Sequence, residues 1–155
     1  MYNNCQYMNV EAHIETEKPI PVRSKTIIHL SLVQNKINET IHSALKPFDI
    51  SLQQFNVLRI LRGQKGAAAN LNTINERMVT KMSNTTRLVD KLIIKDCVAR
   101  QICEKNRRKV EIFINEKGLK ALHEMDAVMT QTEHKLLNGF TENELTQLNE
   151  LLDKL

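Results

Sequence analysis

The sequence predicts a mainly α fold with a small β-hairpin wing (α+β). We expect a winged helix-turn-helix with N- and C-terminal dimerisation helices. Three features support this: an amphipathic segment at residues 83–92, two strand-like segments with a basic loop directly after it, and long apolar stripes towards both ends. A helix followed at once by a basic hairpin is the outline of a winged helix, in which the helix enters a groove of DNA and the hairpin flanks it.

Residues 83–92, the recognition segment, are amphipathic when wound at about 100° per residue. One stripe is largely apolar and comprises Thr85, Leu88, Val89, Leu92 and Ile93. The other stripe comprises Ser83, Asn84, Arg87, Lys91 and Ile94, so that it carries small polar groups and two cations. The segment is expected to stop at residues 95–97, because Asp96 is among the few residue types that tolerate the positive φ common just past a helix end.

Residues 98–102 and 110–114 have the composition of two β-strands. The loop between them holds four cations in five residues, Lys105, Arg107, Arg108 and Lys109. A solvated turn would account for such a loop, but a cationic hairpin tip also suits a narrow and strongly negative minor groove. We favour DNA contact by this tip.

The residues before the recognition segment predict further helices, the last of which forms a helix-turn-helix unit with the recognition segment. Residues 1–25 are polar, contain two prolines and are expected to be a flexible arm. Residues 26–47 carry apolar residues three or four apart, which predicts a long amphipathic helix. Ser51 and Gln54 have the spacing of a capping box that opens a helix with Phe55 inward. A short helix from residue 70 or 71, burying Ile74 and Met78, completes the unit.

The C-terminal residues 116–155 predict two helices, one capped by Asn115 and one opened by a capping box at Thr141 and Glu144. The leucine stripe of the last helix has no later element to cover it, so it must pack on the first helix, on the helix before it, or on another subunit. We expect the dimer interface to use residues of the first and last helices: Ile27, Leu30, Val33, Leu145, Leu148 and Leu152.

Charge is concentrated in the middle of the chain. The net charge is +4, but residues 59–110 hold 13 Lys or Arg against 4 Asp or Glu, whereas residues 111–155 hold 4 against 9. This distribution is expected if the central block meets phosphates, although ordinary surface charge is an alternative.

With the segments placed, the chain resembles the MarR family of bacterial transcription regulators over residues 27–155. The resemblance rests on residues 52–58 (Leu-Gln-Gln-Phe-Asn-Val-Leu), 86–92 (Thr-Arg-Leu-Val-Asp-Lys-Leu), 106–108 (Asn-Arg-Arg) and 115–118 (Asn-Glu-Lys-Gly). It implies one MarR-like domain at residues 26–155, with a winged-helix lobe at 51–114 and dimerisation helices at 26–47 and 116–155. It also implies a homodimer that binds a pseudo-palindromic double-stranded DNA operator, acts as a repressor and releases DNA when a small, commonly aromatic effector binds.

Two positions depart from the family pattern. Asn106 stands where the wing of the family usually has Asp, which removes an ion pair that would hold the tip, whereas Arg108 keeps the position that reaches into the minor groove. Asp96 and Cys97 replace the family's Gly-Leu, a change that local geometry is expected to tolerate.

The expected DNA-binding residues lie on the recognition segment and the hairpin tip: Ser83, Asn84, Thr86, Arg87, Lys91, Lys105, Arg107, Arg108 and Lys109. Arg87 and Lys91 point away from the apolar stripe, and a cation that donates to guanine is the commonest base contact. Short polar side chains at the first turn suit phosphate or adenine, although Ser83 could serve only as a helix cap.

The three cysteines leave a redox alternative open. Cys97 is expected to be buried and inert, whereas Cys5 and Cys103 are the candidates for an oxidant-sensing thiol. A second alternative is a helical dimer that binds a protein partner and keeps the winged helix only as scaffold.

The sequence carries no phosphate loop, nucleophile elbow or metal-ligand spacing, so we expect neither an enzyme nor a cofactor. It also has no apolar run near the roughly 18 residues that a membrane span needs, and no signal pattern. We expect a cytoplasmic protein with no membrane partner, associated with the bacterial nucleoid when it binds DNA.

Overall fold

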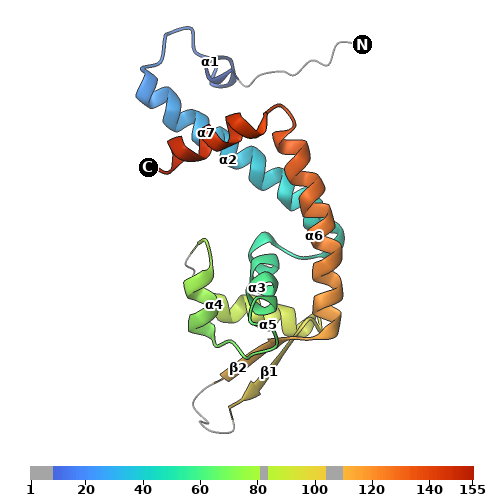
Figure 1. Cartoon of the computed structure of the whole chain (residues 1–155). Coiled ribbons are helices and arrows are strands. Elements are labelled where there is room, and N and C mark those ends of the chain that lie inside the picture. Colours follow the sequence, from blue (N-terminus) through green and yellow to red (C-terminus); the bar gives the residue numbers. More distant parts are fainter. Residues whose placement is uncertain (1–8, 81–83, 104–109) are drawn as a thin grey trace. The chain divides into compact units, whose positions relative to one another are not determined.

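A computed structural model describes residues 9–80, 84–103 and 110–155 (Figure 1). The chain forms two compact units. The helical unit comprises Met1–Thr40 and Gln131–Leu155, and the winged-helix unit comprises Ile41–Thr130. The mainly helical fold with a two-stranded hairpin confirms the predicted fold class.

The winged-helix unit contains the end of α2 (Val22–Leu45), one 3-10 helix, three short α-helices, a hairpin and most of a long helix. In chain order its elements are η1 (Lys46–Phe48), α3 (Leu52–Arg62), α4 (Leu71–Arg77), α5 (Thr85–Ile94), β1 (Val98–Ile102), β2 (Val110–Ile114) and α6 (Glu116–Leu137), whose last turns belong to the helical unit. Both predicted strands are confirmed with the predicted limits.

The core of this unit is built from apolar side chains of every main element. Fully buried members include Leu45, Phe55, Leu58, Ile74, Leu92, Ile112, Leu122 and Met125. The predicted capping box is present, because the Ser51 hydroxyl accepts from the Gln54 backbone and the Gln54 side chain accepts from the Ser51 backbone. The box fixes the start of α3 and thereby the direction in which its apolar face enters the core.

The helix-turn-helix consists of α4 and α5, and a polar contact joins them. The Asn70 side chain caps α4 by accepting from the Thr73 backbone. Near the end of α4, Asn75 accepts a hydrogen bond of 3.1 Å from the Thr85 hydroxyl, and Thr85 is buried. This bond satisfies a hydroxyl that packing has removed from water.

The hairpin is antiparallel and carries an additional contact from the α3–α4 connection. Val98 pairs with Ile114 and Ile102 with Val110. Ala69 forms an isolated bridge to Ile112 through two backbone hydrogen bonds of 3.0 and 2.8 Å. The middle of β2 is therefore attached to the α3–α4 connection by backbone hydrogen bonds.

A tight junction joins α5, β1 and α6. Asp96 has the predicted positive φ, 56°, and Cys97 is buried as predicted. Asn115 caps α6 by accepting from the Gly118 backbone, as predicted, and its amide donates to the Asp96 carbonyl. A Cβ at Gly118 would lie 2.1 Å from the Cys97 carbonyl oxygen, so only glycine allows this approach.

The helical unit contains α1 (Val10–His13), most of α2 (Val22–Leu45), the end of α6 and α7 (Glu142–Leu152). The second predicted capping box, Thr141 with Glu144, is present. None of the helices in the described ranges is both long and apolar enough to cross a membrane.

The N-terminal segment contains more helix than predicted. The long helix was expected from residue 26 and begins at Val22, and α1 lies within the predicted arm of residues 1–25. Asn9 caps α1, and Glu11 forms an ion pair of 2.8 Å with Lys25. These local polar contacts hold a segment that has no sustained hydrophobic period.

Candidate nucleic-acid interface

Helix α5 presents a polar, cationic face to solvent. Thr86, Arg87 and Lys91 are exposed, whereas Leu88, Val89 and Leu92 are buried in the core. The predicted amphipathic division of this helix is therefore confirmed. An exposed arginine and lysine one turn apart on a rigidly packed helix can donate to phosphates or to base edges.

The start of α5 differs from the prediction. The helix was expected from Ser83, but Asn84 is the N-cap residue, Thr85 is the first helical residue, and Asn84 makes no side-chain capping bond. The Asn84 Oδ1 atom is buried and finds no donor among the described residues. Of the short polar side chains proposed for contact, Thr86 is exposed, and Ser83 lies outside the described residues.

Arg100 adds a cation that the sequence did not single out. Its Nη2 atom donates to Asp90 Oδ1 of α5 at 2.6 Å, and both side chains are partly exposed. The pair joins the polar face of α5 to the first strand of the hairpin. Its signal in the sequence is weak, because opposite charges ten residues apart meet only when the turn between helix and strand has formed.

The hairpin tip lies outside the described residues. That gap contains the four cations predicted to contact DNA: Lys105, Arg107, Arg108 and Lys109. It also contains Asn106, which stands where the wing of the resembled family usually has Asp. The strand that leads to the tip is described: four of the five residues of β1 are exposed, and the Gln101 amide donates to Glu111 Oε2 at 3.1 Å.

The cysteines differ in their surroundings. Burial raises the pKa of the Cys97 thiol, which supports the expectation that this residue is inert. Hydrogen bonds from the Cys103 thiol and the Gln101 amide lower the pKa of the Glu111 carboxyl. Cys103 therefore lies beside the carboxylate of Glu111. Cys5 lies outside the described residues.

In the described ranges, no three His, Cys, Asp or Glu side chains lie close enough together to share a metal ion.

Comparison with known proteins identifies the same architecture. Residues 50–110 match the model of the MarR family. The chain is 28% identical over 123 residues to YpoP of Bacillus subtilis (strain 168), an uncharacterized HTH-type transcriptional regulator, covering 79% of this chain and 82% of the relative.

Two solved structures show the fold. The organohalide-sensing regulator RdhR, in its 2,4-dichlorophenol-bound form, has a TM-score of 0.80 and 17% identity, covering 99% of this chain and 87% of RdhR. BpsR of Bordetella bronchiseptica, whose DNA binding is regulated by 6-hydroxynicotinic acid, has a TM-score of 0.76 and 19% identity, covering 88% of this chain and 96% of BpsR. The family match, the curated relative and these folds agree: residues 50–110 carry the MarR-family domain of transcriptional regulators.

Proposed function

We propose that this protein is a transcriptional repressor that acts as a homodimer and binds a pseudo-palindromic operator in double-stranded DNA through α5 and the hairpin. The observation that carries the proposal is the solvent-facing cationic surface of α5, on which Arg87 and Lys91 are exposed while the opposite face is fixed in the core. The Asp90–Arg100 pair continues this surface onto β1.

The homodimer is supported by apolar side chains left in solvent on both predicted dimerisation helices. Ile27 is 62% exposed and Val33 39%, while Leu148 is 38% and Leu152 41% exposed; Leu30 and Leu145 are half-buried. Leu151, not among the predicted interface residues, is 60% exposed on α7. These exposed large apolar groups support the proposal that a second copy of the chain covers this surface.

An effector that releases the DNA is supported by the two solved relatives. One is described with 2,4-dichlorophenol bound, and the DNA binding of the other is regulated by 6-hydroxynicotinic acid. Both molecules are small and aromatic, so we propose an effector of this chemical class for the present chain.

The test is duplex binding by Arg87→Ala, with Lys135→Ala as the matched control. Both variants remove one exposed cation, but Lys135 lies at the end of α6, outside the α5 surface. Selection from mixed genomic duplexes at about 0.15 M salt, where non-specific binding is weakened, first supplies the operator. Loss of a base contact costs roughly 1–3 kcal/mol, so the operator affinity of Arg87→Ala should fall about 5- to 150-fold, with Lys135→Ala near wild type.

An equal effect of the two variants would remove the assignment of Arg87 as a base contact. Failure of the folded dimer to enrich any duplex would reject the DNA-binding proposal and favour the alternative of a protein-binding scaffold.

A further inference from the structure

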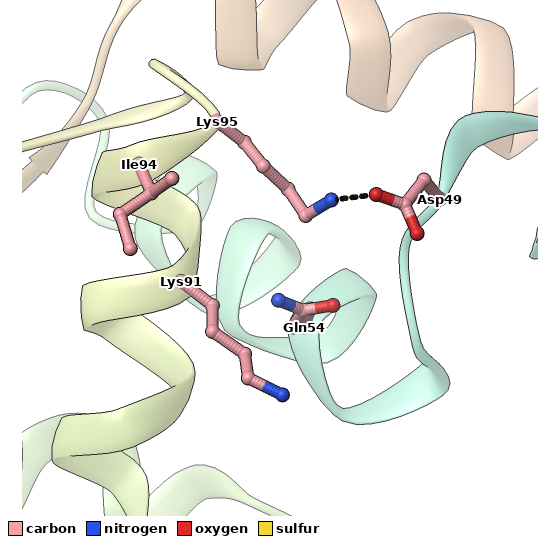
Figure 2. A pocket seen from close by; sticks show the side chains of 5 residues that line it. All are labelled: Asp49, Gln54, Lys91, Ile94 and Lys95. Carbon is pink, nitrogen blue, oxygen red and sulfur yellow. Dashed lines mark hydrogen bonds and ion pairs between the residues drawn. The ribbon is translucent and has the colours of Figure 1, made fainter.

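A hollow of about 340 Å³ lies within the winged-helix unit, at the start of α3 and the end of α5. Its lining residues are Asp49, Gln54, Lys91, Ile94 and Lys95 (Figure 2). It contains two ammonium groups and a carboxamide, and one carboxylate stands at its edge. This composition is cationic and rich in hydrogen-bond donors.

Gln54 supplies a donor that nothing in the described structure uses. Its side chain is only 4% exposed, and its Oε1 atom accepts from the Ser51 backbone at 2.9 Å as part of the capping box. Because the box fixes the oxygen, the nitrogen must face the other way, and this buried Nε2 finds no acceptor among the described residues. Burying such a donor without an acceptor is unfavourable, so an acceptor that reaches it would be favoured.

The two lysines bring their charges to the same hollow, Lys91 from the last turn of α5 and Lys95 from its C-cap position. Lys95 is only 26% exposed and forms an ion pair with Asp49, which is itself 92% exposed. Lys91 forms no ion pair with any residue that the structure describes. Figure 2 shows the Gln54 amide between the ammonium ends of Lys91 and Lys95, with its nitrogen directed towards α5.

We propose that Gln54, Lys91 and Lys95 form a binding site for a phosphate oxyanion. Lys91 and Lys95 would neutralise its charge, and Gln54 Nε2 would donate a hydrogen bond that fixes its position. Ile94, on the exposed side of α5, forms an apolar wall of the same hollow. The oxyanion is either a phosphate of the DNA backbone, in which case the site rests on the proposed function, or a free phosphate group.

The decisive variant is Gln54→Glu. Glutamate keeps the oxygen that the capping box needs, as Glu144 does in the second box of this chain, but it replaces the donor with an anion. Gln53→Glu is the matched control, because it introduces the same charge one residue earlier in α3, where the side chain does not line the hollow. A difference between these variants isolates the site from the change in net charge.

Inorganic phosphate tests the site without DNA. We expect phosphate, but not chloride at the same ionic strength, to shift the NMR signals of the Gln54 side-chain amide and the side chains of Lys91 and Lys95. The lysine shifts should persist in Gln53→Glu and be lost in Gln54→Glu. Asp49→Asn should bind phosphate more tightly than wild type, because it removes the competing carboxylate while asparagine tolerates the positive φ of 54° at this position.

Binding to duplex DNA is the second test of the site. If the occupant is a backbone phosphate, Gln54→Glu should weaken duplex binding several-fold more than Gln53→Glu and reduce the slope of log affinity against log salt by about one. A response to phosphate with equal duplex binding by the two variants would assign the site to a free phosphate.

The proposed site would be rejected if Gln54→Glu and Gln53→Glu gave the same NMR response to phosphate and the same duplex affinity. If the wild-type protein bound no duplex at all, the proposed function would fail, and the response to inorganic phosphate would still decide whether the site exists.

Discussion

Arg100 of β1 and Asp90 of α5 form an ion pair, with 2.6 Å between Nη2 and Oδ1. The pair joins the helix proposed to read DNA to the strand that leads to the hairpin tip. Exposed or half-exposed pairs of this kind contribute roughly 0–1 kcal/mol to stability. Its larger effect should therefore be on the orientation of the hairpin relative to α5.

We predict that Asp90→Asn and Arg100→Met both lower operator affinity while changing the free energy of unfolding by less than about 1 kcal/mol. The two variants change net charge in opposite directions, so a purely electrostatic effect would strengthen binding in Asp90→Asn and weaken it in Arg100→Met. Duplex titrations of both variants distinguish these outcomes. Opposite signs would show that the pair does not position the hairpin.

Gly118 gives a prediction about folding. In Gly118→Ala the new Cβ would meet the Cys97 carbonyl at 2.1 Å, and the neighbouring backbone would have to move. Overpacking of this kind costs about 1–3 kcal/mol, which should lower Tm by at least about 2 °C for a chain of this length. Gly139→Ala is the control, because nothing lies within 4 Å of its Cβ. Equal Tm values for the two variants would contradict the close approach.

Much of the winged-helix unit could be predicted because its signals are local. The strand limits, the capping boxes at Ser51 and Thr141, and the positive φ of Asp96 each depend on residues within a few positions of one another. The buried stripe of α5 follows from helical periodicity alone.

The features that the sequence did not reveal join distant positions. The bridge from Ala69 to Ile112, the pair of Arg100 with Asp90, and the hollow that brings Gln54 to Lys91 all depend on how the helices pack. The start of α5 was also misplaced: the helix begins at Thr85, whose hydroxyl donates to Asn75 of the preceding helix, a contact between two elements that helical periodicity does not reveal.

The apolar surface of α7 predicts an effect on assembly. Leu148→Glu with Leu152→Glu should convert the proposed dimer into a monomer, because burying carboxylates in an apolar interface costs several kcal/mol. Sedimentation equilibrium measures the mass, and circular dichroism checks that the helices remain. Val79→Glu is the control, since Val79 is 94% exposed in the winged-helix unit. A monomeric wild type would reject the dimer itself.

Alkylation should distinguish the described cysteines. Cys97 is 6% exposed and its pKa is raised by burial, whereas Cys103 is half-buried. Iodoacetamide should therefore label Cys103 many-fold faster than Cys97 in the native protein, and peptide mass mapping after timed quenching measures both rates. Faster labelling of Cys97 would show that the junction around Asp96 opens readily.

The raised pKa of Cys97 also has a consequence for stability against pH. The native state holds this proton to a higher pH than the unfolded chain, whose thiols titrate near pH 8.5. Above that pH the unfolded state binds fewer protons, so the free energy of unfolding must fall as pH rises towards the native pKa of the thiol. Urea unfolding from pH 7 to 10 should show a steeper loss for wild type than for Cys97→Ala. Parallel curves for wild type and Cys97→Ala would mean that the Cys97 thiol ionises as easily in the native state as in the unfolded chain.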